Sequence, residues 1–334
     1  MKSNSPSTHN SAVLACCMRN EGMFVVEWLA YHRLLGFQDI LFFTNKCTDG
    51  SDLLLDRLQE LGYVTHIRHD PPKGKAPQIN AMEIAFKHPK VLAAEWLMHI
   101  DADEFVWIET GDGSIKALID AVGEADVIAL AWKMFGNEGH GWWHGGSVLT
   151  SFTRSQGRPM PRAIDHKSIF RHAKFEFATD HMPKSPKVAQ VIAKNTAGRE
   201  ISTNSLATGN TRSRYKVPFG QVVFKNGCIN HYALKTDDVF LMKNDRGDGK
   251  GKIGHKRYYL NGTFHRRFNR NEFEDRKILN RWPETEKLML EMLNDEVVRD
   301  LNRACLSAYI ERRDKILTSD QIAAWTIRSE DRKA

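Results

Sequence analysis

Up to Phe135, the apolar residues of this 334-residue chain follow two alternating patterns. Short continuous apolar runs, the size of buried strands, alternate with longer segments whose apolar residues recur at helical spacing. Gly36 and Gly62 end two of the helical segments, and Pro77 can open another. The pattern predicts strands at 11–18, 39–44, 63–69, 95–100 and 127–132, and helices at 23–35, 53–61, 77–87 and 114–122.

Strands and helices that alternate in this way predict an α/β protein with a mostly parallel central sheet flanked by helices on both faces. The pattern is less regular after Trp132, where we expect strands at 167–172 and 222–231, a polar loop at 195–213 and a short helix at 237–244. We divide the chain into a disordered tail (1–11), a main domain (12–270, with halves 12–134 and 135–270) and a helical C-terminal extension (271–334).

Three polar clusters follow predicted strands where those strands end. They are Arg19-Asn20-Glu21, Asn45 with Asp49, and the acids that begin at Asp101. The carboxyl ends of parallel strands meet at one edge of a sheet, and open α/β sheets bind their ligands there. We therefore expect the three clusters to form one site.

Asp101-Ala102-Asp103-Glu104 carries the strongest chemical signal. It follows an apolar run, so the acids emerge from a strand end rather than enter the core, where an unpaired charge is costly. In an extended chain residues two apart point the same way, so Asp101 and Asp103 can converge. Two such carboxylates repel unless a cation lies between them, and Mg²⁺ and Mn²⁺ prefer oxygen ligands. The motif predicts a divalent metal, although an ordinary acidic turn has the same letters.

The composition and charge limit the classes of protein. Hydrophobic residues make up 41% and charged residues 27%, as in soluble globular proteins. The net charge of +7 favours anionic partners such as nucleotides, phosphates or an acidic membrane surface. A nucleic-acid-binding protein would need a basic stripe with exposed aromatic residues, whereas the basic residues here are dispersed.

The five scattered cysteines argue against a disulfide framework or a zinc site and fit reduced thiols in the cytosol. The first eleven residues lack the apolar core of a signal peptide, and no apolar run has the length of a membrane span. We expect a cytoplasmic location and leave open a peripheral contact with the inner face of the membrane.

Several residues downstream have chemistry that suits a sugar or a phosphate. His231 ends a predicted strand and can join the acids as a ligand, while Lys235 and Arg246 can neutralise phosphate. Glycines around 136–141 let the backbone approach a ligand closely. Each of these residues also has an ordinary structural reading, as surface charge or core packing. The candidates for an acceptor side are His140, Trp142, Trp143, His166, His172 and His181.

The ordered set of motifs resembles family 2-type glycosyltransferases of the bacterial group related to family 92. Each motif is short, but together they span about 13–247 in the family's order. They are MRNEG (18–22), EWLAYHR (27–33), TNKCTDGS (44–51), DADEF (101–105), WKMFGN (132–137), NHYALK (230–235) and KNDRG (243–247).

The resemblance implies a GT-A fold, a nucleotide-diphosphate sugar as donor, with a UDP-sugar expected, and a requirement for Mn²⁺ or Mg²⁺. It implies that 12–134 is the nucleotide-binding half and 135–270 the acceptor half. The metal ligands would be Asp101, Asp103 and His231. The donor site would comprise Arg19, Asn20, Glu21, Asn45, Asp49, Lys75, Gln78, Asp101, Lys235 and Arg246.

The expected reaction is an in-line displacement by an acceptor hydroxyl, with inversion at the anomeric carbon. Inversion needs a general base within hydrogen-bond reach of that hydroxyl, and Asp180, Glu138 and Asp165 are the candidates. Glu138 also stands where related proteins often carry small hydroxyl residues. Glu104 can instead orient the metal site from behind. A nucleotidyltransferase with a similar metal site is the alternative, and a nucleic-acid-binding protein is a weaker one. The sequence sets neither the acceptor nor the oligomeric state.

Overall fold

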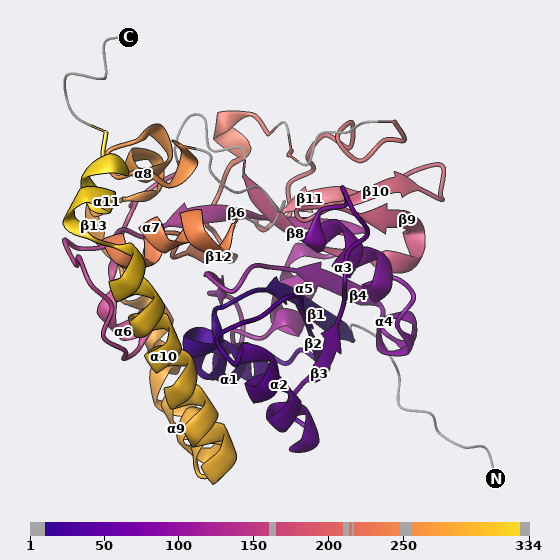
Figure 1. Ribbon diagram of the computed structural model, residues 1–334. Coiled ribbons are helices and arrows are strands. Elements are labelled where there is room, and N and C mark those ends of the chain that lie inside the picture. Colours follow the sequence, from indigo (N-terminus) through magenta and orange to yellow (C-terminus); the bar gives the residue numbers. More distant parts are fainter. Residues whose placement is uncertain (1–10, 160–164, 210–213, 216, 248–255, 328–334) are drawn as a thin grey trace.

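The computed structural model describes residues 11–159, 165–209, 214–215, 217–247 and 256–327. A large curled sheet crosses the molecule, and helices lie on both of its faces (Figure 1). In spatial order the sheet contains β3 (Thr65–Arg68), β2 (Asp39–Thr44), β1 (Ala12–Met18), β4 (Trp96–His99), β8 (His166–Arg171), β6 (Val127–Met134), β12 (Gly227–His231) and β5 (Glu104–Ile108), and β11 (Ala193–Asn195) pairs with β6.

Most strands of this sheet are parallel, as the sequence predicts. β1 pairs in parallel with both β2 and β4, β2 with β3, and β6 with both β11 and β12. β8 runs antiparallel between β4 and β6, and β5 runs antiparallel to β12. Both antiparallel strands therefore begin at the edge where the parallel strands end and run away from it.

Two hydrophobic cores cover the two faces of the sheet. Alternate residues of β1 point into different cores: Leu14 and Cys16 into one, Val13 and Ala15 into the other. The first core also takes in α1 (Val25–Leu34), α2 (Ser51–Glu60) and α5 (Ile115–Val122). The second contains α3 (Pro77–Ala85) and α4 (Pro89–Ala93). Burial on both faces explains why the strands are continuously apolar in sequence.

The C-terminal extension is helical and packs against the first part of the chain. It contains α9 (Trp282–Leu293), α10 (Glu296–Ile316) and α11 (Ser319–Ala324). α9 packs against α1, and α10 packs against α2 and the short 3₁₀ helix η1 (Gly22–Phe24). Figure 1 shows α9 and α10 side by side at the lower left, next to α1. Arg57 of α2 and Asp295 at the start of α10 form an ion pair of 2.6 Å.

The structure confirms the α/β fold class and the helical extension, and it adds elements that the sequence pattern does not reveal. β5 directly follows the acids, and β12 begins at Gly227 rather than near Val222. Residues 1–10 and 210–213 lie outside the described residues, so the expected tail and the full polar loop are not described. The remaining elements are α6 (Val148–Ser151), β7 (Arg154–Ser155), β9 (Phe175–Ala178), β10 (Pro183–Pro186), α7 (Asp237–Arg246), α8 (Thr263–Phe268) and β13 (Phe273–Glu274).

Candidate functional site

The three polar clusters predicted from the sequence lie at one edge of the sheet. β1, β2 and β4 are adjacent and parallel, so the loops that follow them are neighbours. The loops after β1 and β2 are joined directly: the amide of Asn20 donates to Thr48 Oγ1 at 2.9 Å, and Thr48 N donates to Asn20 Oδ1 at 2.8 Å. Asp49 accepts from Gly22 N at 3.1 Å and thus ties the same loops together.

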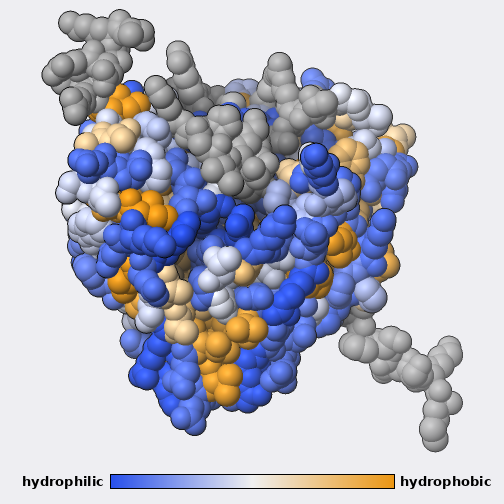
Figure 2. Space-filling view, viewed as in Figure 1, coloured by the Kyte–Doolittle hydropathy of each residue, from blue (hydrophilic) through white to orange (hydrophobic). Residues whose placement is uncertain are grey.

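A pocket of about 480 Å³ opens beside these loops. Its walls come from the loops after β1 and β2, from α7 and from α10. Hydrophilic residues predominate on the surface where α7 and α10 face the N-terminal half, and a hydrophobic area lies below, between α10 and α2 (Figure 2). The predicted donor residues that line the pocket are Arg19, Asn20, Glu21, Asp49 and Arg246.

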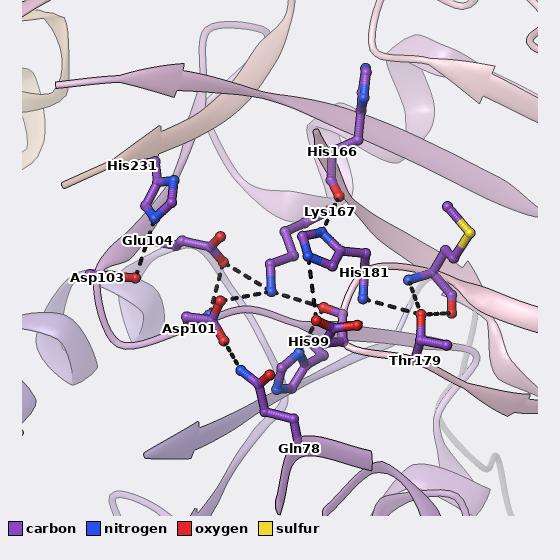
Figure 3. Close-up of polar contacts among 12 residues, drawn as sticks. Gln78, His99, Asp101, Asp103, Glu104, His166, Lys167, Thr179, His181 and His231 are labelled. Atoms are coloured by element: carbon purple, nitrogen blue, oxygen red, sulfur yellow. Dashed lines mark hydrogen bonds and ion pairs between the residues drawn. The ribbon is translucent and has the colours of Figure 1, made fainter. Parts of the chain in front are cut away.

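Asp101 and Asp103 do not converge on one point, contrary to the expectation from an extended chain. The chain turns after β4, and Glu104 N donates to the carbonyl oxygen of Asp101 at 3.1 Å. The two carboxylates consequently contact different partners (Figure 3). Asp101 accepts from Gln78 Nε2 at 2.6 Å, so this predicted donor residue contacts the first of the acids.

Lys167 neutralises the Asp101 side of the site. Its ammonium lies 3.1 Å from Asp101 Oδ2 and 3.4 Å from Glu104 Oε2, and it donates to the carbonyl oxygen of Asp180 at 2.8 Å. Burial would lower the pKa of Lys167, but the surrounding acids raise it above its usual value. Burial raises the pKa of Glu104 well above its ordinary value, despite the nearby Lys167. Glu104 also accepts from Asp101 N at 2.8 Å, so it fixes the turn that carries both aspartates.

Asp103 lies between Lys243 and His231. Lys243 Nζ donates to Asp103 Oδ2 at 2.7 Å, and His231 Nε2 lies 3.5 Å from Oδ1. Burial alone would raise the pKa of Asp103, but Lys243 and His231 outweigh it and hold the pKa well below the usual range. The register of β12 against β5 pairs His231 with Glu104, which explains why His231 reaches the acids from a distant part of the sequence.

The ligand chemistry of Asp101, Asp103 and His231 fits Mn²⁺ or Mg²⁺. Burial lowers the pKa of His231, so its imidazole is in the neutral form that binds metals, and its buried Nδ1 has no hydrogen-bond partner among the described residues. However, no three acid, histidine or cysteine side chains in the described ranges are arranged around one point as a metal requires. The structure brings Asp103 and His231 together, and Gln78 and Lys167 engage Asp101.

Lys235 is the least satisfied cation of the site. It is 1% exposed, and its ammonium has no hydrogen-bond partner among the described residues. Its nitrogen lies 4.4 Å from the centre of the Phe24 ring, which lines the pocket. Burial lowers its pKa to about 8, and the charges of Asp103, Lys243, Glu21 and Arg246 also act on it. The ammonium therefore lies next to a residue of the pocket wall and within electrostatic range of Asp103 and Glu21.

The remaining predicted donor residues lie at the margin. Arg246, which lines the pocket together with Val239, Met242 and Asp245 of α7, binds Glu21 at 2.7 Å. Asn45 is half-buried in the loop after β2. Lys75 forms a surface ion pair of 2.7 Å with Glu83 of α3, so the structure does not bring its ammonium to the acids.

Of the three candidate bases, the structure brings Asp180 to the acids. Lys167 bonds both Asp101 and the backbone of Asp180, and the Asp180 carboxylate lies 3.5 Å from His181 Nε2. Glu138 instead accepts from the backbone N–H groups of Thr153 and Arg154 and stabilises a turn. Asp165 forms ion pairs with Arg267 and Arg214. Carboxylates engaged in this way are poor proton acceptors.

The predicted acceptor-side residues are dispersed. The rings of His181 and Trp132 lie 5.2 Å apart, and that of His231 lies 4.3 Å from Trp132, so His181 belongs to the site. His166 is in the same region, since its carbonyl oxygen lies 2.9 Å from His181 Nδ1. His172 lies at the opposite edge of the sheet, because β8 is antiparallel and Arg171 pairs with Trp96 at the start of β4.

The segment around Trp142 lies near α10 rather than near the acids. Trp143 is buried against Phe24 and Phe152, and the exposed Trp142 ring faces the guanidinium of Arg313 at 4.9 Å. His140 is exposed, and its ring lies 5.7 Å from that of Phe152. This segment thus supports the pocket wall behind Phe24 and does not contact the aspartates through any described interaction.

The sequence did not indicate that two lysines and one helix of the C-terminal extension belong to the site. Lys167 and Lys243 contact Asp101 and Asp103, and α10 supplies part of the pocket wall. A lysine inside an apolar strand pattern, as at 167, is the one local signal that could have indicated a buried ion pair. No local signal marks the α10 residues.

Comparison with known proteins identifies the family. Residues 14–232 match the model of glycosyltransferase family 92. A family 92 protein of Ricinus communis is 32% identical over 117 residues, which cover 31% of this chain and 19% of the relative. One of Oryza sativa subsp. japonica is 27% identical over 171 residues, covering 48% and 27% of the two chains. The matched parts thus span well under half the length of these relatives.

The chain belongs to glycosyltransferase family 92, and its α/β architecture is of the GT-A type that the resemblance implies. Among solved structures, S. aureus TarS 1–349 in complex with UDP-GlcNAc has a TM-score of 0.32 and 15% identity, over 49% of this chain and 46% of that one. HddC from Yersinia pseudotuberculosis has a TM-score of 0.33 and 13% identity, over 57% and 93%. The similarity to these two structures extends over 49% and 57% of this chain.

In the described ranges, no helix combines the length and apolar character that crossing a lipid bilayer would require. All five cysteines are free.

Proposed function

We propose that the protein transfers a sugar from a nucleoside diphosphate donor, with a UDP-sugar expected, to an acceptor hydroxyl. The observation that carries this proposal is the buried ammonium of Lys235, which has no hydrogen-bond partner among the described residues. An unpaired buried charge is costly, and an anionic ligand offsets that cost. The backbone of Lys235 also has a positive φ of 58°, which is uncommon for lysine and typical of residues held in place for function.

The surroundings of Lys235 suit a diphosphate. Arg246, whose guanidinium is paired with Glu21, lines the pocket, and the charges of Arg246 and Asp103 both act on Lys235. A diphosphate bound at this position would have its nucleoside in the pocket and its sugar toward Asp101 and Asp180. The family membership and the nucleotide sugar bound by TarS support the same class of donor.

Asp101, Asp103 and His231 are the proposed ligands of Mn²⁺ or Mg²⁺. When bound, the ion would add positive charge that stabilises the departing diphosphate. The positive charges of Lys235 and Arg246 would also stabilise the departing diphosphate. Lys167 and Glu104 hold the turn that presents the aspartates.

Asp180 is the proposed general base for an inverting reaction. Its carboxylate lies beside His181, and its backbone is bonded to the lysine that contacts Asp101. A base must reach the acceptor hydroxyl directly or through one water, and Asp180 is the candidate adjacent to the acids. The free cysteines fit a cytoplasmic location, which belongs to this proposal, and a saccharide is the expected acceptor.

The test is a titration of the purified protein with UDP-sugars and Mn²⁺, followed by an assay of the released product. Release of nucleoside diphosphate supports sugar transfer, whereas release of pyrophosphate would identify a nucleotidyltransferase instead. Asp103→Asn should lower turnover at least a hundredfold, while Asp300→Asn, an exposed carboxylate of α10, should leave it unchanged. Full turnover in Asp103→Asn would overturn the proposed site.

A further inference from the structure

α10 lies outside the segment that matches the family model, yet one of its faces lines the pocket. The match ends at residue 232, and α10 spans Glu296–Ile316. Residues three, four and seven apart share one face of a helix, and the lining residues of α10 follow this spacing. They are Ala308, Tyr309, Glu311, Arg312 and Lys315.

α10 is fixed against the loop that follows β1. Cys305 packs so closely on Gly22 that a Cβ atom at Gly22 would lie 2.4 Å from its sulfur and 2.9 Å from its Cβ. The glycine of the MRNEG motif is therefore required by a helix almost 300 positions later in the chain. Arg312 crosses to α7 and binds Asp245 with distances of 2.8 and 3.1 Å. The pocket wall formed by α10 is thus held in place on two sides.

The pocket has charged and apolar parts. Arg246 of α7 lines it, and Lys235 is buried behind Phe24 of its wall, so these are the cations that a diphosphate would approach. The α10 wall contributes one aromatic residue, Tyr309, beside the charged residues Glu311, Arg312 and Lys315, and the lining residues Met23, Met242 and Ala308 add apolar surface around it. A nucleoside diphosphate has the same polarity, with a charged end and a flat heteroaromatic end. If the charged end lies at Lys235, the base faces α10.

We propose that Tyr309 binds the nucleobase of the donor, so that a helix outside the family-matched segment completes the nucleotide site. This proposal rests on the proposed function, because it takes the pocket to be the donor site. Stacking on an aromatic side chain tolerates every base and is a substantial part of the binding energy of bases to proteins. The neighbouring apolar residues exclude water from the other contacts of the base.

Calorimetric titration of two variants with UDP, UMP and inorganic pyrophosphate tests the proposal. Tyr309→Leu keeps an apolar side chain of similar reach but removes the ring, and it should weaken UDP and UMP about tenfold or more while leaving pyrophosphate unchanged. Tyr309→Phe keeps the ring and should bind UDP like the wild type. Arg303→Ala, an exposed position of α10 that does not line the pocket, is the matched control.

The outcomes separate this inference from the proposed function. If the wild type binds UDP and Tyr309→Leu binds it equally well, the inference is wrong and the donor site stands. If the wild type binds no nucleotide, both fail. Photolabelling of the wild-type protein with 5-azido-UDP, which carries the reactive group on the base, needs no variant. Labelling of the α10 peptide that contains Tyr309 supports the inference, and labelling only elsewhere overturns it.

Discussion

Replacing Lys235 with methionine should make the protein more stable and at the same time weaken its binding of nucleoside diphosphates. Methionine has similar length and no charge, so the substitution removes the buried ammonium and leaves most of the packing against Phe24. A lysine that only stabilises the fold would not give higher stability and weaker ligand binding when it is replaced. A lysine that binds an anionic ligand would give both, because its buried charge destabilises the unliganded protein and is compensated only when the ligand binds.

The magnitude follows from the pKa of the lysine. Burial lowers the pKa from 10.5 to about 8, and the charges around Lys235 partly cancel. Each pKa unit corresponds to about 1.4 kcal/mol, so the charged form destabilises the folded protein by about 3 kcal/mol relative to a lysine in water. Lys235→Met should recover a large part of this, about 1–3 kcal/mol, at pH 7.

The pH dependence of the free energy of unfolding is a second test of whether the charge of Lys235 destabilises the folded protein. The unfolded chain holds this proton up to pH 10.5, whereas the folded protein releases it near pH 8. Because the unfolded state binds more protons in this interval, the lysine's cost is complete below about pH 8 and disappears as the pH rises toward 10.5. The stability difference between Lys235→Met and the wild type should narrow over the same interval.

Lys167→Met is the matched control, because Lys167 is equally buried but paired with Asp101 and Glu104. Removing one partner of a buried ion pair leaves the other charge buried and unpaired, so the free energy of unfolding of this variant should be lower by about 3–5 kcal/mol. Urea unfolding followed by tryptophan fluorescence measures both variants, and calorimetry measures UDP binding. If Lys235→Met were destabilised like Lys167→Met, or bound UDP like the wild type, the reasoning about the unpartnered ammonium would be refuted.

Three further substitutions test other parts of the site and core. Lys243→Met removes the ammonium 2.7 Å from Asp103, so Mn²⁺ should bind about tenfold more tightly in an electron paramagnetic resonance titration; unchanged affinity would argue against Asp103 as a ligand. Gly22→Ala should lower the free energy of unfolding by about 1–3 kcal/mol, because the new Cβ clashes with Cys305 and Ser51. Adding Cys305→Ala should restore part of this stability. If the wild type, the single variant and the double variant were equally stable, α10 would not pack on the motif as described. Burial lowers the pKa of His32 to about 3, so between pH 3 and pH 6.5 the unfolded chain binds a proton that the folded protein does not. The free energy of unfolding should therefore fall as the pH is lowered from 6.5 toward 3. In urea unfolding, His32→Gln should reduce this pH dependence, and an unchanged pH dependence would assign it to other groups.

The parallel half of the fold was predictable because its signals are local. β1, β2 and β4 are largely apolar runs, since both faces of the sheet are covered, and β1, β2 and β3 are each followed by helical periodicity. The antiparallel strands were harder. β5 begins at Glu104, so no separate turn signal marks the turn at Asp101–Glu104 in the sequence. β8 lies between β4 and β6 because of pairing between segments that are distant in the sequence.

The site divides in the same way. The clusters after β1, β2 and β4 could be placed together from the rule for parallel strand ends, and His231 came from the order of motifs. The partners of the aspartates could not be predicted, because Lys167 and Lys243 lie 66 and 140 positions from the acids that they contact. A sequence shows that a carboxylate is present, but ion pairs of this separation depend on the finished packing.

The contact between Gly22 and Cys305 also has a consequence for biosynthesis. The loop after β1 emerges from the ribosome well before α10, so its pocket lacks a wall until α10 has been made. At about 5–20 residues per second, translation of the intervening chain takes roughly 15–60 s. Contacts between such distant segments also slow folding. During that time the nascent chain exposes the apolar faces of η1 and α2 that α10 later covers, so the growing protein is most open to aggregation before its last helices appear.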